Sequence, residues 1–318
     1  MEGTVRGIDR IISFARNNSL YFILGVIIIA LSILSPAFLT VGNLFDIVLQ
    51  SSINGIIALG VTFVISTGGI DLSVGAIWGL TGVACGLIMK AGVHWSLAML
   101  GCIILGAVCG MFSGALITKG RIQPFITTLA AMSIYRGLAL IVTKGYTVYN
   151  FPKPFRYIGA GRLFGVVPIP VFVLVGVLLV SVFIFERTTF GRYLVSIGNN
   201  KEAARLCGID VNKMITFAYV YAGILCAIGG GILATARLNA AEPIAGSSAE
   251  TDAIAAVVIG GTSLAGGATK IRRTVIGALL LGMTNNGLTL LNVPTYYKMT
   301  VVGIIIILAM LGDSINKD

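Results

Sequence analysis

Residues 186–213 read ERTTFGRYLVSIGNNKEAARLCGIDVNK and form a polar, basic stretch between two long apolar segments. Within this stretch, the run from Asn200 to Gly208 predicts a short capped helix. Asn200 is a good N-cap, Glu202 suits the dipole of the first turn, and Gly208 suits the left-handed turn that ends a helix. The residues between them are strong helix formers, namely Ala203, Ala204, Arg205 and Leu206. A capped helix on the wet side of a membrane protein suits docking of a partner, although these residues also fit an ordinary amphipathic loop helix.

The composition of the whole chain indicates a membrane protein. Of its 318 residues, 57% are hydrophobic and only 11% are charged, and the mean hydropathy is +0.98. An ordinary soluble domain is about 25% charged. Several apolar stretches approach the roughly 20 residues that a helix needs to cross hydrocarbon. We therefore expect an all-α polytopic membrane protein with about ten transmembrane helices.

The apolar stretches predict one transmembrane domain over residues 19–312, after a cytoplasmic N-terminal segment at 1–18 and before a cytoplasmic tail at 313–318. The expected spans are 20–34, 44–65, 71–89, 97–117, 125–142, 169–185, 214–236, 253–259, 274–291 and 297–311. The eighth is too short to cross alone, so we expect a broken or half-length helix buried inside the bundle. If this element did not cross, Lys270, Arg272 and Arg273 would lie outside, against the positive-inside rule. Crossing places both termini in the cytoplasm.

Asp71 and Ser73 follow a break in the apolar pattern at Thr67-Gly68-Gly69. An ionisable residue at membrane depth is a functional candidate by default, so these two residues are candidates for the transport pathway or its gate. The alternative is that one of them caps the next helix beside the cytoplasmic face. The surrounding glycines and hydroxyl favour that second interpretation.

A faint internal repeat links two glycine-rich segments. Gly68-Gly69-x-x-Leu72-x-x-Gly75-Ala76 echoes Gly260-Gly261-x-x-Leu264-x-x-Gly267-Ala268. The halves of transporters are often related by repeats. Because glycine-rich matches arise easily, this echo carries little weight in the sequence.

The longest expected outer segment, residues 144–170, mixes cations with aromatic side chains. Its four cations are Lys144, Lys153, Arg156 and Arg162. They suit a docking surface for a binding protein that carries acidic patches. The aromatic side chains between them also fit an interfacial belt.

No constellation in the sequence points to chemistry within this chain. It contains no Gly-Lys dipeptide, and therefore no phosphate-binding loop of the ATPase type. It has neither a nucleophile with a base nor a cluster of metal ligands, so we expect no catalytic residue, no metal site and no cofactor. Most of its basic residues fall in expected cytoplasmic segments, so the net charge of +10 needs no nucleic-acid partner. Apart from Asp71 and Arg136 the expected spans carry few charges, which disfavours an ion-coupled secondary transporter but leaves it as the alternative.

Several blocks of sequence together resemble the permease subunits of bacterial ABC importers. Glu202-Ala203-Ala204-x-x-x-Gly208 is similar to the EAA loop of those permeases. The blocks FGRY (190–193), IGNN (197–200), GIDVNK (208–213), STGGIDLSVG (66–75) and DAIAAVVIGGTSLAGG (252–267) resemble the ribose-type sugar branch. The likeness covers nearly the whole chain from residue 35 onward. The Ile-x-Leu-Pro tail of the wider EAA pattern is missing after Gly208, as it is in the sugar branch.

This resemblance implies a transport function, a set of partners and two candidate sites. The chain would form the pathway for a sugar or related small polar solute as a multi-pass protein of a bacterial plasma membrane, the inner membrane if the cell is Gram-negative. Its implied partners are a second permease copy in a homodimer, a separate ABC ATPase and an extracytoplasmic solute-binding protein. The implied ATPase-coupling residues are Asn200, Glu202, Ala203, Ala204, Arg205, Leu206 and Gly208. The resemblance also points to the broken segments near Asp71 and near Thr262 and Ser263 as the pathway or gate.

Overall fold

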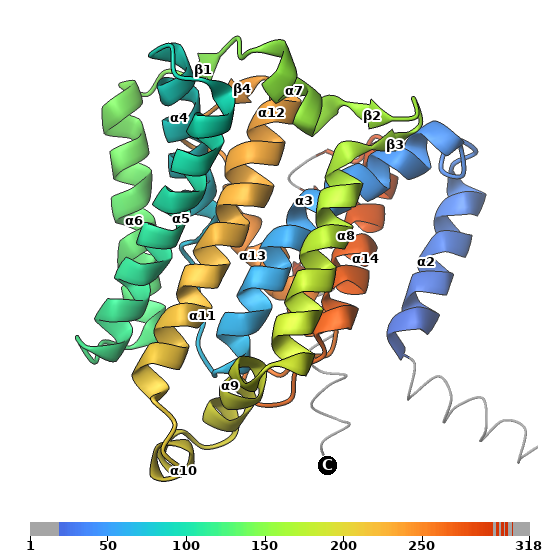
Figure 1. The fold of residues 1–318 in the computed structure, drawn as a ribbon. Coiled ribbons are helices and arrows are strands. Elements are labelled where there is room, and N and C mark those ends of the chain that lie inside the picture. The colour runs from blue at the N-terminus through green and yellow to red at the C-terminus, as the bar shows by residue number, and fades with distance from the viewer. Residues whose placement is uncertain (1–18, 295–296, 299, 302, 305–306, 308–318) are drawn as a thin grey trace, which may run out of the picture.

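The structure is a computed structural model that describes residues 19–294, 297–298, 300–301, 303–304 and 307. Over this part of the chain the fold is a helical bundle with two short two-stranded sheets at one end (Figure 1). This arrangement agrees with the all-α membrane protein that the composition predicts. The expected segments 1–18 and 313–318 lie outside the described residues, as does much of the tenth expected span.

The elements follow the expected order of apolar stretches. The longer helices are α2 (Ser19–Leu34), α3 (Val41–Ser66), α4 (Val74–Lys90), α5 (Trp95–Thr118), α6 (Pro124–Thr143), α8 (Ile169–Val182), α11 (Val211–Cys226) and α14 (Ile271–Leu290). The shorter helices are α7 (Lys153–Ala160), α9 (Thr189–Asn199), α10 (Lys201–Leu206), α12 (Thr235–Leu238) and α13 (Ala249–Ile259). Two π-helical stretches, η1 (Phe183–Arg187) and η2 (Ala227–Ala234), extend α8 and α11. The strands are β1 (Val148–Tyr149), β2 (Arg162–Leu163), β3 (Val167–Pro168) and β4 (Ala240–Ala241).

Five continuous helices within the described residues are long and apolar enough to cross a membrane. They are Val41–Ser66, Trp95–Thr118, Pro124–Thr143, Ile169–Arg187 and Val211–Leu238. Two further apolar helices, Leu20–Leu34 and Val74–Lys90, are shorter. The third expected span begins later than predicted, because residues 71–73 are not helical and α4 begins at Val74.

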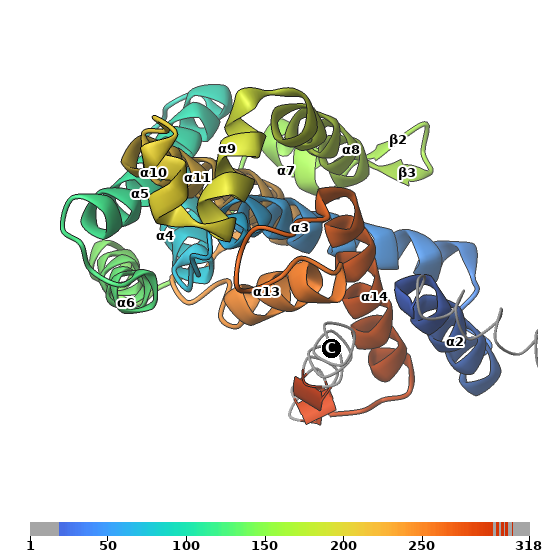
Figure 2. The same cartoon turned by 90° about the horizontal axis from the view of Figure 1, so that it is seen from below.

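Helix α3 forms the centre of the bundle. It packs against α11, α13, α14 and α8 (Figures 1 and 2). Residues 55–66 are buried on every side, and 83% of the most apolar window of this helix is buried. A helix that is apolar all round is expected to be surrounded by protein or lipid. Here the surroundings are protein. The conformation of the short segment that follows α3, residues 67–73, therefore depends on the neighbouring helices.

Helices α5 and α11 pack so closely that their backbones are in contact along the face of α5 that carries Gly106, Gly110 and Gly114. A Cβ atom added at Gly114 would lie 2.9 Å from the Cα atom of Thr216, and one added at Gly110 would overlap the carbonyl group of Tyr219. Gly106 meets Gly223 in the same way. In a bilayer such close packing supplies the van der Waals contact that holds helices together. The four-residue spacing of Gly106, Gly110 and Gly114 predicts a face for close packing of another helix, and the structure shows that this helix is α11.

The seventh expected span changes its helical winding at its triple glycine. The triple glycine 229–231 lies inside η2, the π-helical continuation of α11. Gly230 lies against the ring of Trp78, and a Cβ atom at Gly231 would lie 2.8 Å from the Sγ atom of Cys102. The wider winding therefore brings this backbone directly onto α4 and α5.

A small cap covers the end of the bundle where α7 and the strands lie (Figure 1). Strand β1 pairs antiparallel with β4, so that Val148 faces Ala241. The backbone N–H of Phe151 donates to the side-chain oxygen of Asn239 at 2.9 Å, which adds a second tie between these segments. Phe155 is fully buried and Phe151 is nearly so. These two aromatic residues are therefore part of the core and not of an interfacial belt.

The eighth expected span is the short helix α13, as predicted, but it begins four residues earlier, at Ala249. Its 11 residues correspond to about 16 Å, roughly half the hydrocarbon thickness. One face, built mainly of alanine and valine, packs against α14 and α3. The backbone then turns through 260–270 before α14 begins at Ile271.

Candidate functional site

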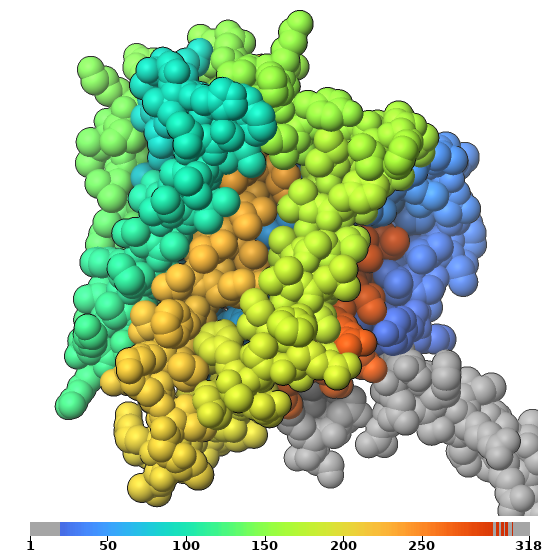
Figure 3. Space-filling model, viewed as in Figure 1, coloured from blue at the N-terminus to red at the C-terminus, as the bar shows by residue number. Residues whose placement is uncertain are grey.

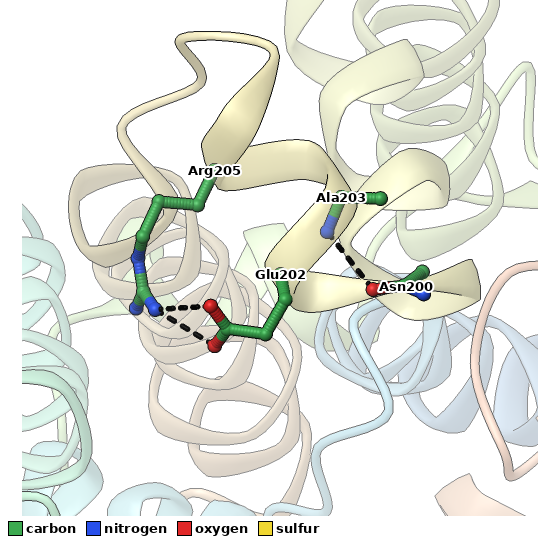
Figure 4. A network of polar contacts seen from close by, with 4 residues as sticks. All are labelled: Asn200, Glu202, Ala203 and Arg205. Atoms are coloured by element: carbon green, nitrogen blue, oxygen red, sulfur yellow. Dashed lines mark hydrogen bonds and ion pairs between the residues drawn. The ribbon is translucent and has the colours of Figure 1, made fainter.

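Helix α10 is a six-residue helix held by the predicted cap (Figure 4). The side-chain oxygen of Asn200 accepts the backbone N–H of Ala203 at 2.9 Å. Arg205 donates to the carboxylate of Glu202 at 2.7 Å, although both side chains are exposed and such pairs contribute only about 0.2–1 kcal/mol. Gly208 adopts φ +81° directly after the helix, in the left-handed region that the sequence predicts for it. The cap and the glycine therefore define both ends of this helix.

One face of α10 anchors the helix and the opposite face has no partner within the described chain. Ala204 is buried in a cluster with Ile197, Val211 and Ile215. Leu206, in contrast, is 88% exposed. Helix α10 protrudes from the end of the molecule opposite the sheets (Figures 1 and 3). This leucine is therefore available for contact with another protein.

The turn after α10 is also held by a charged cap. The carboxylate of Asp210 accepts the backbone N–H of Lys213 at 3.1 Å and pairs with the Nζ atom of the same residue at 3.0 Å. The hydrogen bond from the Lys213 amide lowers the pKa of Asp210 below its usual value. The block GIDVNK therefore encodes a left-handed glycine followed by the N-cap of α11.

Asp71 is fully buried in the break between α3 and α4. Its Oδ1 atom accepts the backbone N–H of Ser73 at 2.8 Å and the hydroxyl of Ser73 at 2.6 Å. Its Oδ2 atom has no hydrogen-bond partner among the described residues. Ser73 occupies the N-cap position of α4, but its side chain donates to Asp71 and makes no cap bond to the helix. The capping interpretation is therefore correct for the position of Ser73 and wrong for its bonding, and Asp71 lies in the protein interior.

The backbone of the same break is held from two other helices. The carbonyl of Ile70 accepts a hydrogen bond from Tyr219 Oη of α11 at 3.2 Å and from Thr128 Oγ1 of α6 at 3.3 Å. Neither residue was singled out from the sequence, because nothing in its local pattern separates it from the many other polar residues of the spans. Their roles follow only from the packing of α6 and α11 beside the break.

Thr262 and Ser263 are buried in the second break, between α13 and α14. The hydroxyl of Thr262 accepts the backbone N–H of Lys270 at 3.1 Å, and the carbonyl of Ser263 accepts the N–H of Gly266 at 3.1 Å. The two breaks touch, because the N–H of Gly267 donates to the carbonyl of Ser66 at 3.0 Å. The two glycine segments that echo one another in the sequence are therefore neighbours in space.

A cavity of about 810 Å³ lies between α10 and the first break. Its walls include Gly69 and Tyr219 beside the break, and Lys201, Glu202 and Arg205 on α10. Arg121 and Gln123, in the turn between α5 and α6, add to the polar lining. The charged face of α10 therefore opens onto a polar cavity that leads to the break that carries Asp71.

The four cations of the expected outer segment lie at the end of the bundle that carries α7 and the short strands. Lys144 follows α6, Lys153 and Arg156 are on α7, and Arg162 is on β2. All four are exposed, and Arg162 is 3.9 Å from the carboxylate of Asp46. The structure thus places these four cations together at one end of the bundle.

Two arginines link elements that the sequence does not connect. Arg136 of α6 donates to the carbonyls of Pro243 at 3.1 Å and of Ala245 at 2.6 Å, in the loop that leads into α13. Arg272 at the start of α14 donates to Glu186 of η1 at 2.9 Å. The half-buried guanidinium of Arg136 therefore binds backbone carbonyls of the protein. No group of three or more potential metal ligands occurs among the described residues.

Comparison with known proteins gives a consistent result. Residues 43–310 match the family model described as "Branched-chain amino acid transport system / permease component". The ribose import permease protein RbsC of Escherichia coli (strain K12) is 45% identical over 293 residues, which cover 91% of each chain. RbsC of Bacillus subtilis (strain 168) is 46% identical over 290 residues, covering 91% of this chain and 89% of the relative. The D-allose transport system permease protein AlsC of E. coli (strain K12) is 41% identical over 295 residues, covering 92% and 90%. No solved structure matches the chain.

Proposed function

We propose a working arrangement for this chain from one premise: it belongs to the permease family of the branched-chain amino acid transport systems, in the branch of the sugar ABC importers. It is the membrane-spanning permease subunit of a sugar ABC importer, and it is a transport component and not an enzyme. A permease of this kind works with an ATPase subunit and a solute-binding protein. Its solute is proposed to be a monosaccharide, and the names of its relatives make ribose the first candidate to test.

Helix α10 is proposed to be the coupling helix that docks on the ATPase. The observation that carries this proposal is the exposure of Leu206 on a short helix whose opposite face is anchored through Ala204. An exposed apolar side chain gains by burial in a partner, and a rigidly capped helix loses little entropy when it docks. The sequence likeness to the EAA loop supports the same residues, from Asn200 to Gly208.

The docking proposal is tested by Leu206→Glu. This variant should insert and fold normally, because Leu206 makes no core contact, but it should no longer retain the ATPase subunit in detergent-solubilised complexes. Phe164→Glu is the matched control, because Phe164 is also 88% exposed and lies between β2 and β3, at the opposite end of the molecule. Retention of the ATPase by Leu206→Glu at the wild-type level would contradict the docking role.

The remaining features of the arrangement are proposed from the same premise. The chain has ten spans with both termini in the cytoplasm of a bacterial cell, and two copies form a homodimer that encloses the pathway. Asp71, Ser73, Thr262 and Ser263 line or control this pathway from the two breaks. The outer cations Lys144, Lys153, Arg156 and Arg162 receive the solute-binding protein.

The function as a whole is tested by reconstitution in vesicles. Uptake of ribose should require this chain, the ATPase, the loaded binding protein and ATP together. Uphill uptake by the chain alone, abolished by a protonophore, would instead support the ion-coupled secondary transporter and would overturn the proposal.

A further inference from the structure

We propose that Gly198 and Asn199, the last residues of α9, form a junction that transmits a displacement of α10 to both pathway breaks together. This inference rests on the coupling role proposed for α10 and names the residues through which that role reaches the pathway. Gly198 and Asn199 are positioning residues, since neither is proposed to touch the solute or the nucleotide.

The first observation is a contact between three backbones with no side chain between them. A Cβ atom added at Gly198 would overlap both the carbonyl oxygen of Ser66 and the amide nitrogen of Gly267. A Cβ atom added at Gly266 would lie 2.7 Å from the amide nitrogen of Gly68 and 3.0 Å from the Cα atom of Gly198. The three segments belong to α9, to the break after α3 and to the break after α13. Because no flexible side chain can absorb a shift, movement of one backbone must displace the others.

The second observation concerns Asn199, which contacts the other side of the junction. Its side-chain oxygen occupies the space that a Cβ atom of Gly267 would take, and Gly267 has φ +75°. Asn199 directly precedes Asn200, the N-cap of α10. The same short run of chain therefore caps the proposed coupling helix and contacts the second break.

The surroundings of α10 favour this junction as the route that reaches both breaks. The cavity of about 810 Å³ separates the charged face of α10 from Thr67–Gly69. The charged side chains of α10 therefore do not pack directly against the first break. At the other end of α10, a Cβ atom at Gly208 would meet nothing within 4 Å. The N-terminal end of α10 thus joins backbone packing that reaches both breaks, whereas its C-terminal end joins α11, which bonds to the first break through Tyr219.

The junction leads directly to both candidate pathway sites. From Ser66 the chain passes through residues 67–70 to buried Asp71, and from Gly267 the turn is closed by hydrogen bonds of Thr262 and Ser263. A shift of α10 through the junction would therefore move the two breaks in register. Such joint movement is what a gate built from both breaks requires.

The experiment measures how many solute molecules are transported per ATP hydrolysed, in vesicles that contain the complete transporter with ribose-loaded binding protein. Asn199→Ala loosens the junction without adding an atom, and Gly198→Ala forces it apart. Gly176→Ala in α8 is the matched control, because a Cβ atom there would meet nothing within 4 Å. Asn199→Ala should keep the ATPase bound and hydrolysing, while the ratio of transport to hydrolysis falls by about fivefold or more, the lower end of typical coupling between distant sites. Gly198→Ala should lower the ratio likewise, and Gly176→Ala should leave it unchanged.

The outcomes distinguish a failure of this inference from a failure of the proposed transport function on which it rests. ATP-independent uptake, or no uptake, by the wild-type complex sinks the proposed function whatever the variants do. If the wild type couples normally and Asn199→Ala keeps its ratio, the junction does not transmit and the inference is wrong. Loss of ATPase binding in Asn199→Ala would place this residue in docking and would also overturn the inference. If Gly198→Ala fails to assemble, Asn199→Ala decides alone.

Discussion

Single side chains hold the irregular segments of this protein in place. Arg136 is an example inside the bundle. Its guanidinium is half-buried, and it donates to two carbonyls of the loop before α13, while Gly79 of α4 lies against the same group. A buried carbonyl without a donor costs about 1–3 kcal/mol. Arg136 therefore supplies donors that the loop backbone lacks.

Replacing Arg136 by glutamine should destabilise the folded chain by about 2 kcal/mol, because one shorter amide cannot reach both carbonyls. Thermal unfolding of the purified protein should show this as a lowered midpoint. Arg156→Gln is the control, since Arg156 is exposed on α7 and its loss should leave the midpoint unchanged. An unchanged midpoint in Arg136→Gln would mean that other groups, or water, satisfy the loop.

Asn200 acts at the same scale by satisfying one amide of α10. Asn200→Ala should destabilise this short helix by about 1 kcal/mol, whereas Asn200→Ser, which keeps a capping oxygen, should cost much less. Hydrogen exchange of the Ala203 amide should accelerate in the alanine variant and stay slow in the serine variant. Equal exchange rates in the two variants would show that the cap seen in Figure 4 does not hold α10 in solution.

Among the elements, the broken helices carry the functional argument, because they place irregular backbone inside a membrane protein. Such backbone is tolerated only where protein groups satisfy it. Here the break after α3 is satisfied by Tyr219 and Thr128, and the break after α13 by Thr262. One of the buried side-chain atoms that have no hydrogen-bond partner among the described residues, Oδ2 of Asp71, lies in the first break. A group left unpaired at a discontinuity is a reasonable place to look for the pathway.

Removing the Tyr219 hydroxyl tests whether the first break must be held. Tyr219→Phe keeps the ring in its buried site but removes the donor to Ile70, so transport should fall while the amount of inserted protein stays constant. Tyr221→Phe is a matched control, because Tyr221 bonds to Ser181 of α8 and not to either break. Equal transport by the two variants would show that this hydrogen bond is dispensable for the pathway.

At the scale of the whole molecule, the two ends of the bundle carry different surfaces. One end has the capped helix α10 with exposed Leu206, and the other has the small sheets, α7 and the exposed outer cations. The cap of α7 and the short strands is tied to α13 through the pairing of β1 with β4 and the short loop that Arg136 holds. A partner that docks on the cap therefore contacts a structure that is continuous with the second break.

Replacing Lys144, Lys153, Arg156 and Arg162 together by glutamine should weaken docking of the solute-binding protein by about tenfold, since exposed charge pairs contribute about 0.2–1 kcal/mol each. The residual docking should depend less on salt than that of the wild type. Replacing Lys119, Arg121, Arg192 and Lys213, which are exposed but lie at the α10 end, should leave this docking unchanged. If the variant with all four cations replaced still docks the solute-binding protein at the wild-type level, these cations are not part of the interface.

The sequence by itself determined the membrane class, the order of the apolar helices, the glycine face of α5 on which another helix packs, and both ends of α10. These features depend on composition, on the spacing of residues along one helix, and on caps that act over a few residues. Only the tertiary structure decided that Asp71 is bonded to Ser73 and buried, that Arg136 binds loop carbonyls, and that the two glycine breaks meet at Gly198. Those contacts join residues that are up to about 200 positions apart, or depend on which neighbours cover a break, so no local pattern encodes them. The packing around α3 brings them together.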